Sequence, residues 1–202
     1  MPRSFLILHG VNGSGMDHWQ THLAQRLRRR GEVVLYPELS SKEQPDCDVW
    51  IAELDQQLRS VPDFGELTVI CHSLSCILWM HYAADPVPPV ERLLLVAPPG
   101  PSILQEFRPT FFPIPIDEER LKASAREILL VCTNADPRCP EKAAVCYGAE
   151  FGLRTVILPD EAEHINIASG FGDWPEMSAL CLAAEFPETL VSQLSAARPA
   201  VS

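Results

Sequence analysis

Long hydrophobic runs and a hydrophobic leader are both missing from this sequence of 202 residues. No stretch approaches the about 20 apolar residues that a membrane-spanning helix needs. After Arg3 the apolar run reaches only from Phe5 to Leu8, which is shorter than the hydrophobic region of a secretory signal peptide. We therefore expect a cytoplasmic protein with no membrane partner.

Paired cysteine motifs are missing as well. The seven cysteines are an odd number, no two form a C-x-x-C pair, and several lie inside apolar runs, where a thiol packs as a small hydrophobic group. This usage argues against a disulfide-linked secreted fold and for a reducing compartment. His18 and His22 have a helical i, i+4 spacing that could bind a metal, but no third ligand accompanies them. We expect neither a metal nor a cofactor.

Positive charge is scarce. The chain carries 16 Lys and Arg against 27 Asp and Glu, which gives a formal net charge of −11. A surface of that sign repels a phosphate backbone, so a nucleic-acid partner is not expected. The one basic run, Arg26-Leu27-Arg28-Arg29-Arg30, falls at the predicted end of a helix, where cations complement the helix dipole. We interpret it as a solvated helix terminus.

What the sequence does contain is a series of short apolar runs. Hydrophobic residues make up 47% of the chain, a globular composition, and the length suits a single domain over residues 1–202. Six runs rich in Val, Ile and Leu are nearly unbroken, which indicates strands buried on both faces, as in a parallel sheet. These predicted strands are Ser4–Leu8, Glu32–Tyr36, Leu67–Cys71, Arg92–Ala97, Glu127–Cys132 and Arg154–Leu158.

Helical patterns separate most of these strands. They cover Asp17–Arg30, Val49–Val61, Leu74–Ala84, Pro140–Phe151 and Trp174–Ala197, the last with a break expected at Pro187. Strands that alternate with helices imply right-handed crossovers between parallel strands. The predicted fold class is α/β, with about six parallel strands, helices on both faces and a minimal cap.

Two segments fall outside this alternation. Residues 98–122 carry six prolines and three phenylalanines without a clear strand or helix pattern. A long loop in a compact domain is usually functional or disordered, so we interpret it either as a flap over a pocket or as a cover for the sheet edge. As a flap it would contribute Phe107, Phe111 and Phe112 to a substrate pocket that also contains Asn12. Residues 197–202 are expected to form a frayed tail.

The strand Leu67–Cys71 leads through His72 to Ser73, and a helix is predicted to begin directly afterwards. A serine between strand and helix is typical of a nucleophile elbow, which exposes the hydroxyl and places the next amide at a helix N-terminus. The usual pattern G-x-S-x-G is altered here to Cys71-His72-Ser73-Leu74-Ser75, with small residues at both flanking positions. Ser73 is the candidate nucleophile. A helix cap is its alternative role, and Ser75 is the alternative nucleophile.

A serine nucleophile needs a general base and an acid that orients the base. Asp136 follows the strand Glu127–Cys132, and His164 follows the strand Arg154–Leu158. Open parallel sheets bind ligands at the carboxyl ends of their strands, and the chain order Ser, Asp, His is that of α/β-hydrolases. We predict Ser73, Asp136 and His164 as a catalytic triad. Asp160 is a rival for the acid, but it lies too near His164 in the sequence.

Two backbone amides are predicted to stabilise an oxyanion. One belongs to Leu74, at the start of the helix after Ser73. The other comes from Val11 or Asn12, in the glycine-rich turn His9-Gly10-Val11-Asn12-Gly13 after the first strand. This turn does not match a dinucleotide or phosphate-binding fingerprint. His9 and His72 flank the site and are expected to pack or hydrogen-bond there.

Several further motifs accompany these residues. They are Leu8-His9-Gly10, Gly13-Ser14-Gly15, His18-Trp19, His72-Ser73-Leu74, Asn134-x-Asp136-Pro137, His164-Ile165-Asn166 and Ser169-Gly170-Phe171-Gly172-Asp173-Trp174-Pro175-Glu176. Together they resemble the YdeN-type bacterial serine hydrolases, relatives of retinoblastoma-binding protein nine, over nearly the whole chain. The resemblance implies a compact α/β-hydrolase fold with Ser73, Asp136 and His164 as the triad. Ser75 and Glu163 stand where that family usually has glycine.

The expected function is hydrolysis of a small carboxylic ester or amide through an acyl-enzyme intermediate, without a cofactor. The alternative is a low-activity protein-binding module that keeps the fold. The retinoblastoma-binding signature L-x-C-x-E is absent, and its nearest match, residues 130–134, ends in Asn on a predicted buried strand. The expected partner is a small-molecule substrate, and the sequence leaves a monomer and a weak dimer both open.

Overall fold

Six parallel strands form one sheet in the computed structural model, which describes residues 3–61, 66–115 and 117–196. The strand order is β2-β1-β3-β4-β5-β6, and every neighbouring pair is parallel. The predicted parallel sheet is confirmed, with ends that shift by a few residues. The strands are β1 (Ser4–Leu8), β2 (Val33–Leu35), β3 (Leu67–His72), β4 (Val90–Val96), β5 (Ala125–Thr133) and β6 (Arg154–Leu158).

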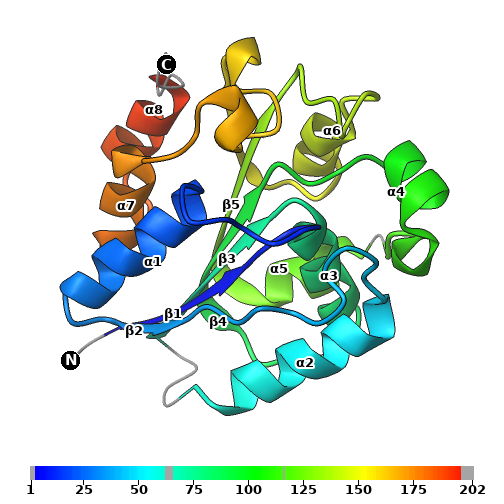
Figure 1. Ribbon diagram of the computed structural model, residues 1–202, viewed down its shortest axis with the longest axis horizontal. Helices are drawn as coiled ribbons and strands as arrows, with labels where there is room; N and C mark the ends of the chain where they lie inside the picture. The colour runs from blue at the N-terminus through cyan, green and yellow to red at the C-terminus, as the bar shows by residue number, and fades with distance from the viewer. Residues whose placement is uncertain (1–2, 62–65, 116, 197–202) are drawn as a thin grey trace.

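Helices cover both faces of this sheet, as predicted (Figure 1). One face carries α1 (Trp19–Arg29), α7 (Pro175–Leu182) and α8 (Glu188–Ala196). The other carries α2 (Cys47–Arg59), α3 (Leu74–Tyr82) and α6 (Ala143–Glu150). None of the helices within the described ranges is long and apolar enough to cross a membrane.

The two faces build two separate cores from alternate residues of the same strands. In β1, Phe5 and Ile7 pack with α1 and α7, whereas Leu6 and Leu8 pack with α2 and α3. Every residue of β1 is buried. Because side chains alternate across a strand, covering both faces leaves no position for an exposed polar residue. This explains the unbroken apolar runs of the sequence.

The segment 98–122 is more regular than its sequence suggests. It contains α4 (Pro101–Phe107), the 3-10 turn η2 (Pro109–Phe111) and α5 (Glu118–Ala123), so the expectation of a connection without clear structure is wrong. Pro101 and Pro109 stand at the first positions of their helices. A proline there gives up an amide that would have no helical partner in any case, so these prolines start helices.

The two ends of the chain refine the predicted helices. The break at Pro187 is confirmed, because α7 ends at Leu182 and α8 begins at Glu188. At the other end α1 begins at Trp19 rather than Asp17, and the His18 side chain accepts the Gln20 amide as the N-cap. The tail expected over residues 197–202 lies outside the described residues.

A buried arginine ties the sheet to the C-terminal helices. Arg92 of β4 is 2% exposed, and its Nε donates to Thr68 Oγ1 at 3.1 Å. The terminal nitrogens donate to the carbonyl oxygens of Ala183 at 2.8 Å and Cys181 at 2.9 Å. The last carbonyls of a helix have no partner within it, so Arg92 supplies the donors that α7 lacks.

Replacing Arg92 with Met should therefore destabilise the fold more than its apolar volume would suggest. The change leaves the Cys181 carbonyl without its donor, a loss of about 1–3 kcal/mol, whereas the Ala183 carbonyl keeps Arg3 as a donor at 3.0 Å. We therefore expect the free energy of unfolding to fall by about 2 kcal/mol. Urea denaturation measures this loss. The matched variant Arg126→Met, at a side chain that is 67% exposed, should change stability by at most about 0.5 kcal/mol. Equal losses in the two variants would contradict the anchoring role.

Candidate active site

Ser73 occupies a strained turn between β3 and α3. Its backbone has φ 57° and ψ −124°, a conformation that residues other than glycine rarely adopt. The Ser73 amide donates to the Val96 carbonyl at 2.9 Å, which fixes the turn against the end of β4. The Ser73 side chain makes no capping hydrogen bond to α3. The turn therefore presents the hydroxyl at the carboxyl edge of the sheet instead of using it as a helix cap.

Two small neighbours make room for this turn. A Cβ atom on Gly10 would lie 2.7 Å from Ser73 Cβ, so only glycine fits there without a shift. Ser75 is fully buried. Its Oγ accepts the His72 amide at 2.9 Å and lies within donor range of the Leu8 carbonyl at 2.8 Å and the His72 carbonyl at 2.9 Å. Ser75 thus links β1 to β3 and has no free hydroxyl for the role of alternative nucleophile.

The structure brings Ser73, His164 and Asp136 into one hydrogen-bonded chain. His164 Nε2 lies 2.9 Å from Ser73 Oγ, and His164 Nδ1 lies 2.8 Å from Asp136 Oδ2. The Asp136 carboxylate can only accept, so His164 carries its proton on Nδ1 and leaves Nε2 free to accept from Ser73. Asp136 is 4% exposed and also accepts the Arg138 amide at 2.7 Å. The rival Asp160 is exposed in the short turn η3 (Asp160–Ala162) and makes no hydrogen bond to His164.

The loop that carries His164 is held by three consecutive carbonyl groups. Thr133 Oγ1 donates to the Glu163 carbonyl at 2.9 Å, and Trp19 Nε1 donates to the Ile165 carbonyl at 2.9 Å. Between them, His72 Nε2 lies 3.1 Å from the His164 carbonyl. The sequence led us to expect His72 to pack or hydrogen-bond at the site, which this contact confirms, but it predicted neither the Thr133 nor the Trp19 contact. Together the three contacts fix His164 from β5, α1 and the end of β3.

Two residues of the loop that carries His164 have a strained backbone conformation. Glu163 has φ 41° and Ile165 has φ 51°, both in the left-handed region that favours glycine. Glycine adopts such a conformation without strain, so Glu163 holds it at a cost in free energy. Its side chain is exposed and makes no hydrogen bond to His164.

Two backbone amides of residues that line this site have no hydrogen-bond partner among the described residues. Within the described ranges, the amides of Val11 and Leu74 donate to no other group, and both residues line the cavity. The Asn12 amide is already bound to the Lys42 carbonyl at 2.9 Å. Of the two amides that the sequence offered in the glycine-rich turn, only that of Val11 is free.

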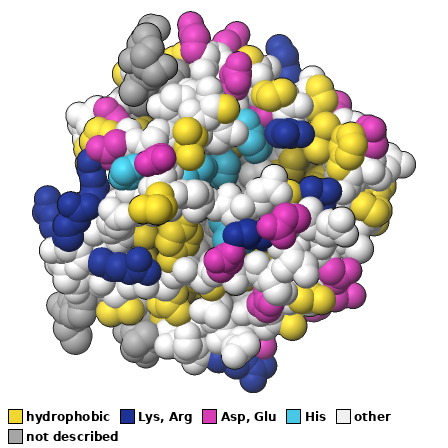
Figure 2. All heavy atoms as spheres, in the orientation of Figure 1, with side chains coloured by type: hydrophobic (Ala, Val, Ile, Leu, Met, Phe, Trp, Pro, Cys, Tyr) yellow, Lys and Arg dark blue, Asp and Glu magenta, His cyan; other side chains and the backbone are white. Residues whose placement is uncertain are grey.

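The cavity above Ser73 has a volume of about 470 Å³. Histidine side chains are visible in a hollow near the middle of this face, with hydrophobic and basic side chains beside them (Figure 2). Ile103, Leu104 and Phe107 of α4 form an apolar wall. The segment 98–122 thus contributes a helix to the cavity.

The expected pocket residues divide into two groups. Asn12 and Phe107 line the cavity. Phe111 is fully buried and packs edge-on against Trp50, with ring centres 5.7 Å apart, so it belongs to the core under α2. Phe112 follows η2 and also lies outside the cavity. Neither ring lines the cavity, so their expected placement in the pocket was wrong.

A row of buried histidine rings runs through the site. His18, His72 and His164 form a row, with ring centres 5.0 Å and 5.2 Å apart. Burial lowers the pKa of His18 to about 4, and the neighbouring His164 and His22 add to this effect. Burial also lowers the pKa of His9, and it lowers that of His72 well below the usual value. In the described ranges no group of three or more His, Cys, Asp or Glu side chains could hold a metal ion.

The buried His18 should make stability depend on pH. Its pKa is lower in the folded chain than the value of about 6.5 expected after unfolding, so below pH 6.5 the unfolded chain binds the extra proton. The stabilisation is complete above pH 6.5 and is lost as the pH falls towards 4, by about 2 kcal/mol between pH 7 and pH 5. His18→Asn keeps a capping side chain but removes the titration. We expect urea denaturation at pH 7 and pH 5 to show a smaller difference for this variant.

The matched control is His22→Asn, at a partly exposed position of α1. It should keep the pH difference of the parent protein. If both variants have the pH dependence of the parent, buried His18 does not carry the effect.

Comparison with known proteins agrees with this architecture. The ydeN gene product of B. subtilis superposes with a TM-score of 0.78 at 17% identity, over 89% of this chain and 96% of that one. A YdeN-like hydrolase from Pectobacterium atrosepticum gives 0.70 at 22% identity, over 93% and 92%. The esterase domain of a Rhodothermus marinus protein gives 0.59 at 16% identity, over 84% and 81%. These likenesses confirm the α/β-hydrolase fold.

No curated protein sequence matches the chain significantly. The family model described as serine hydrolase matches residues 5–183, which cover all six strands except Ser4 and include the residues Ser73, Asp136 and His164. Since that match covers most of its length, the chain belongs to the serine hydrolase family.

Proposed function

We propose that the protein hydrolyses a small carboxylic ester or amide through an acyl-enzyme intermediate, with Ser73 as the nucleophile, His164 as the general base and Asp136 as the orienting acid. The observation that carries this proposal is the 2.9 Å contact between Ser73 Oγ and His164 Nε2, with the opposite nitrogen of the ring on a buried carboxylate. A serine hydroxyl becomes nucleophilic only when such a base accepts its proton. The esterase domain from Rhodothermus marinus, a protein of the same fold, supports the choice of an ester.

In the acylation step the Ser73 oxygen attacks the substrate carbonyl while its proton moves to His164 Nε2. The amides of Val11 and Leu74 are placed to donate to the oxygen that gains negative charge. The bond to the leaving group then breaks, and the leaving group takes the proton from His164. Water repeats the sequence on the acyl-enzyme, giving a carboxylic acid and restoring Ser73.

Asp136 acts by holding the imidazole rather than by taking a proton. Its carboxylate lies within 3.0 Å of Nδ1 through both oxygens, and it is nearly inaccessible to water. A fixed buried anion favours the imidazolium that forms during each proton transfer. The carbonyl contacts from Thr133, Trp19 and His72 add to this by fixing the backbone on both sides of the ring.

A fluorophosphonate probe tests the role of Ser73 directly. We expect the parent protein to be labelled and Ser73→Ala to remain unlabelled, while Ser192→Ala, at an exposed serine of α8, is labelled like the parent. In an ester assay His164→Gln and Asp136→Asn should lower kcat by about 10³–10⁴-fold. A folded parent that neither reacts with the probe nor cleaves any ester would sink the enzymatic proposal and favour a binding module.

The contact between Gly10 and Ser73 gives a second test. Gly10→Ala places a methyl group 2.7 Å from Ser73 Cβ, so the turn must shift and the labelling rate should fall by at least about tenfold, since a small misplacement of reacting groups is costly. Gly15→Ala is the matched control, because a Cβ there meets no atom within 4 Å. Equal labelling of the two variants would show that the turn tolerates a Cβ at position 10.

A further inference from the structure

The charges that line the cavity have the opposite sign to the protein as a whole. Acidic residues outnumber basic ones by 27 to 16 in the chain. Among the described residues, the cavity lining nevertheless contains Arg108 and Arg138 and no Asp, Glu or Lys. A concave site of one sign with low-dielectric walls concentrates ligands of the opposite charge. Two arginines therefore set the field that a ligand meets on entering.

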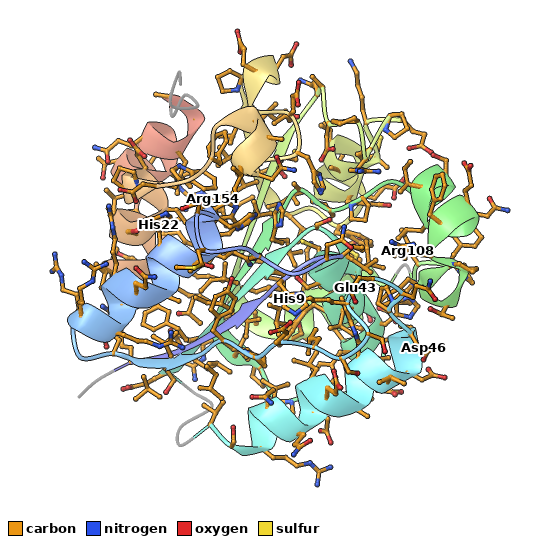
Figure 3. All side chains as sticks on the ribbon, viewed as in Figure 1. His9, His22, Glu43, Asp46, Arg108 and Arg154 are labelled. Atoms are coloured by element: carbon orange, nitrogen blue, oxygen red, sulfur yellow. The ribbon has the colours of Figure 1, made fainter. Side chains whose placement is uncertain are left out.

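Arg108 is held in place without an acidic partner. It follows α4 directly, is half-buried, and its Nε is buried with no hydrogen-bond partner within the described part of the chain. Its terminal nitrogens reach only backbone carbonyls, those of Phe107 and, at 3.5 Å, Glu43. Figure 3 shows Arg108 with Glu43 close by, but the Glu43 side chain is exposed and forms no ion pair with it. A buried donor without an acceptor costs free energy, which a bound anion would recover.

Arg138 is fixed through its backbone and free at its side chain. Its amide donates to Asp136 Oδ1 at 2.7 Å, and its carbonyl accepts the Gly100 amide at 2.8 Å. The side chain is exposed and forms no ion pair with any described residue. The Arg138 backbone is therefore fixed beside the proposed triad. No described carboxylate competes with a ligand for its guanidinium.

This arrangement differs from that of the arginines that stabilise the fold. Arg3, Arg26 and Arg154 each pair with a carboxylate, and the guanidinium of buried Arg92 is bound by Thr68 and by backbone carbonyls of the C-terminal segment. Arg120 has no ion pair either, but it lies on α5 and does not line the cavity. A planar guanidinium matches the two oxygens of a carboxylate, and the pair of hydrogen bonds is stronger than a neutral one.

We propose that Arg108 and Arg138 bind a carboxylate on the substrate, so that the cavity selects esters in which a short apolar segment separates the scissile bond from an anionic end. The apolar segment packs against Ile103, Leu104 and Phe107 of α4, the helix that Arg108 follows. This inference rests on the proposed ester hydrolysis, because it assigns the substrate class of that same site.

Matched esters test the proposal. One pair is the para-nitrophenyl monoester of adipic acid and para-nitrophenyl hexanoate, which have the same chain length and differ in the terminal carboxylate of the acyl part. The other pair is para-carboxyphenyl butyrate and its methyl ester, which differ in the leaving group. We expect kcat/KM, corrected for spontaneous hydrolysis, to favour the charged member of at least one pair by about tenfold, the equivalent of about 1.4 kcal/mol.

The double variant Arg108→Gln/Arg138→Gln should bring this ratio to about one, while Arg120→Gln should keep the ratio of the parent. High salt should lower the ratio in the parent, because part of each guanidinium faces solvent. Unfolding midpoints of all variants establish that they remain folded.

Two failures are distinguishable. If esters are cleaved and the probe reacts, but the charged member is favoured in neither pair or the preference survives in the double variant, the carboxylate site is wrong and the hydrolase proposal stands. If neither labelling nor cleavage of any ester occurs in the folded parent, the hydrolase proposal itself fails.

Discussion

The turn at Ser73 is the constraint on which the rest of the site depends. A left-handed residue between a buried strand and a helix projects its hydroxyl from the sheet, and it survives only because the neighbouring backbone can approach closely. Gly10, in the turn after β1, allows that approach, and the Val96 carbonyl at the end of β4 accepts the Ser73 amide. The three central strands therefore position one hydroxyl group.

The second requirement is a base at the right distance from that hydroxyl. His164 sits on a loop with two residues in left-handed conformations, which would relax if nothing opposed them. Thr133, His72 and Trp19 oppose the relaxation by holding three successive carbonyls. Because these side chains come from three different elements, the geometry of the base depends on the whole sheet and on α1.

The ionisable side chains around the cavity differ in their charge. Burial keeps His9, His18 and His72 neutral, so they can pack and hydrogen-bond without adding charge near the proposed base. The one buried carboxylate at the site, Asp136, is paired with His164. Arg108 and Arg138 then give the cavity a positive field on an acidic protein.

The sequence by itself determined the parallel sheet and the order in which Ser73, Asp136 and His164 follow their strands. Both can be predicted because they depend on local sequence patterns. An unbroken apolar run indicates a strand that is buried on both faces of the sheet, and the carboxyl ends of parallel strands meet at one edge of that sheet. Only the tertiary structure decided that Phe111 lies in the core and that the Asn12 amide donates to the Lys42 carbonyl. It also decided that Trp19 donates a hydrogen bond to the carbonyl of Ile165, which is 146 residues further along the chain. It also decided that Arg108 and Arg138 share one cavity. Contacts between segments so far apart produce no periodic pattern in the sequence. They depend on how the helices pack once the sheet has formed.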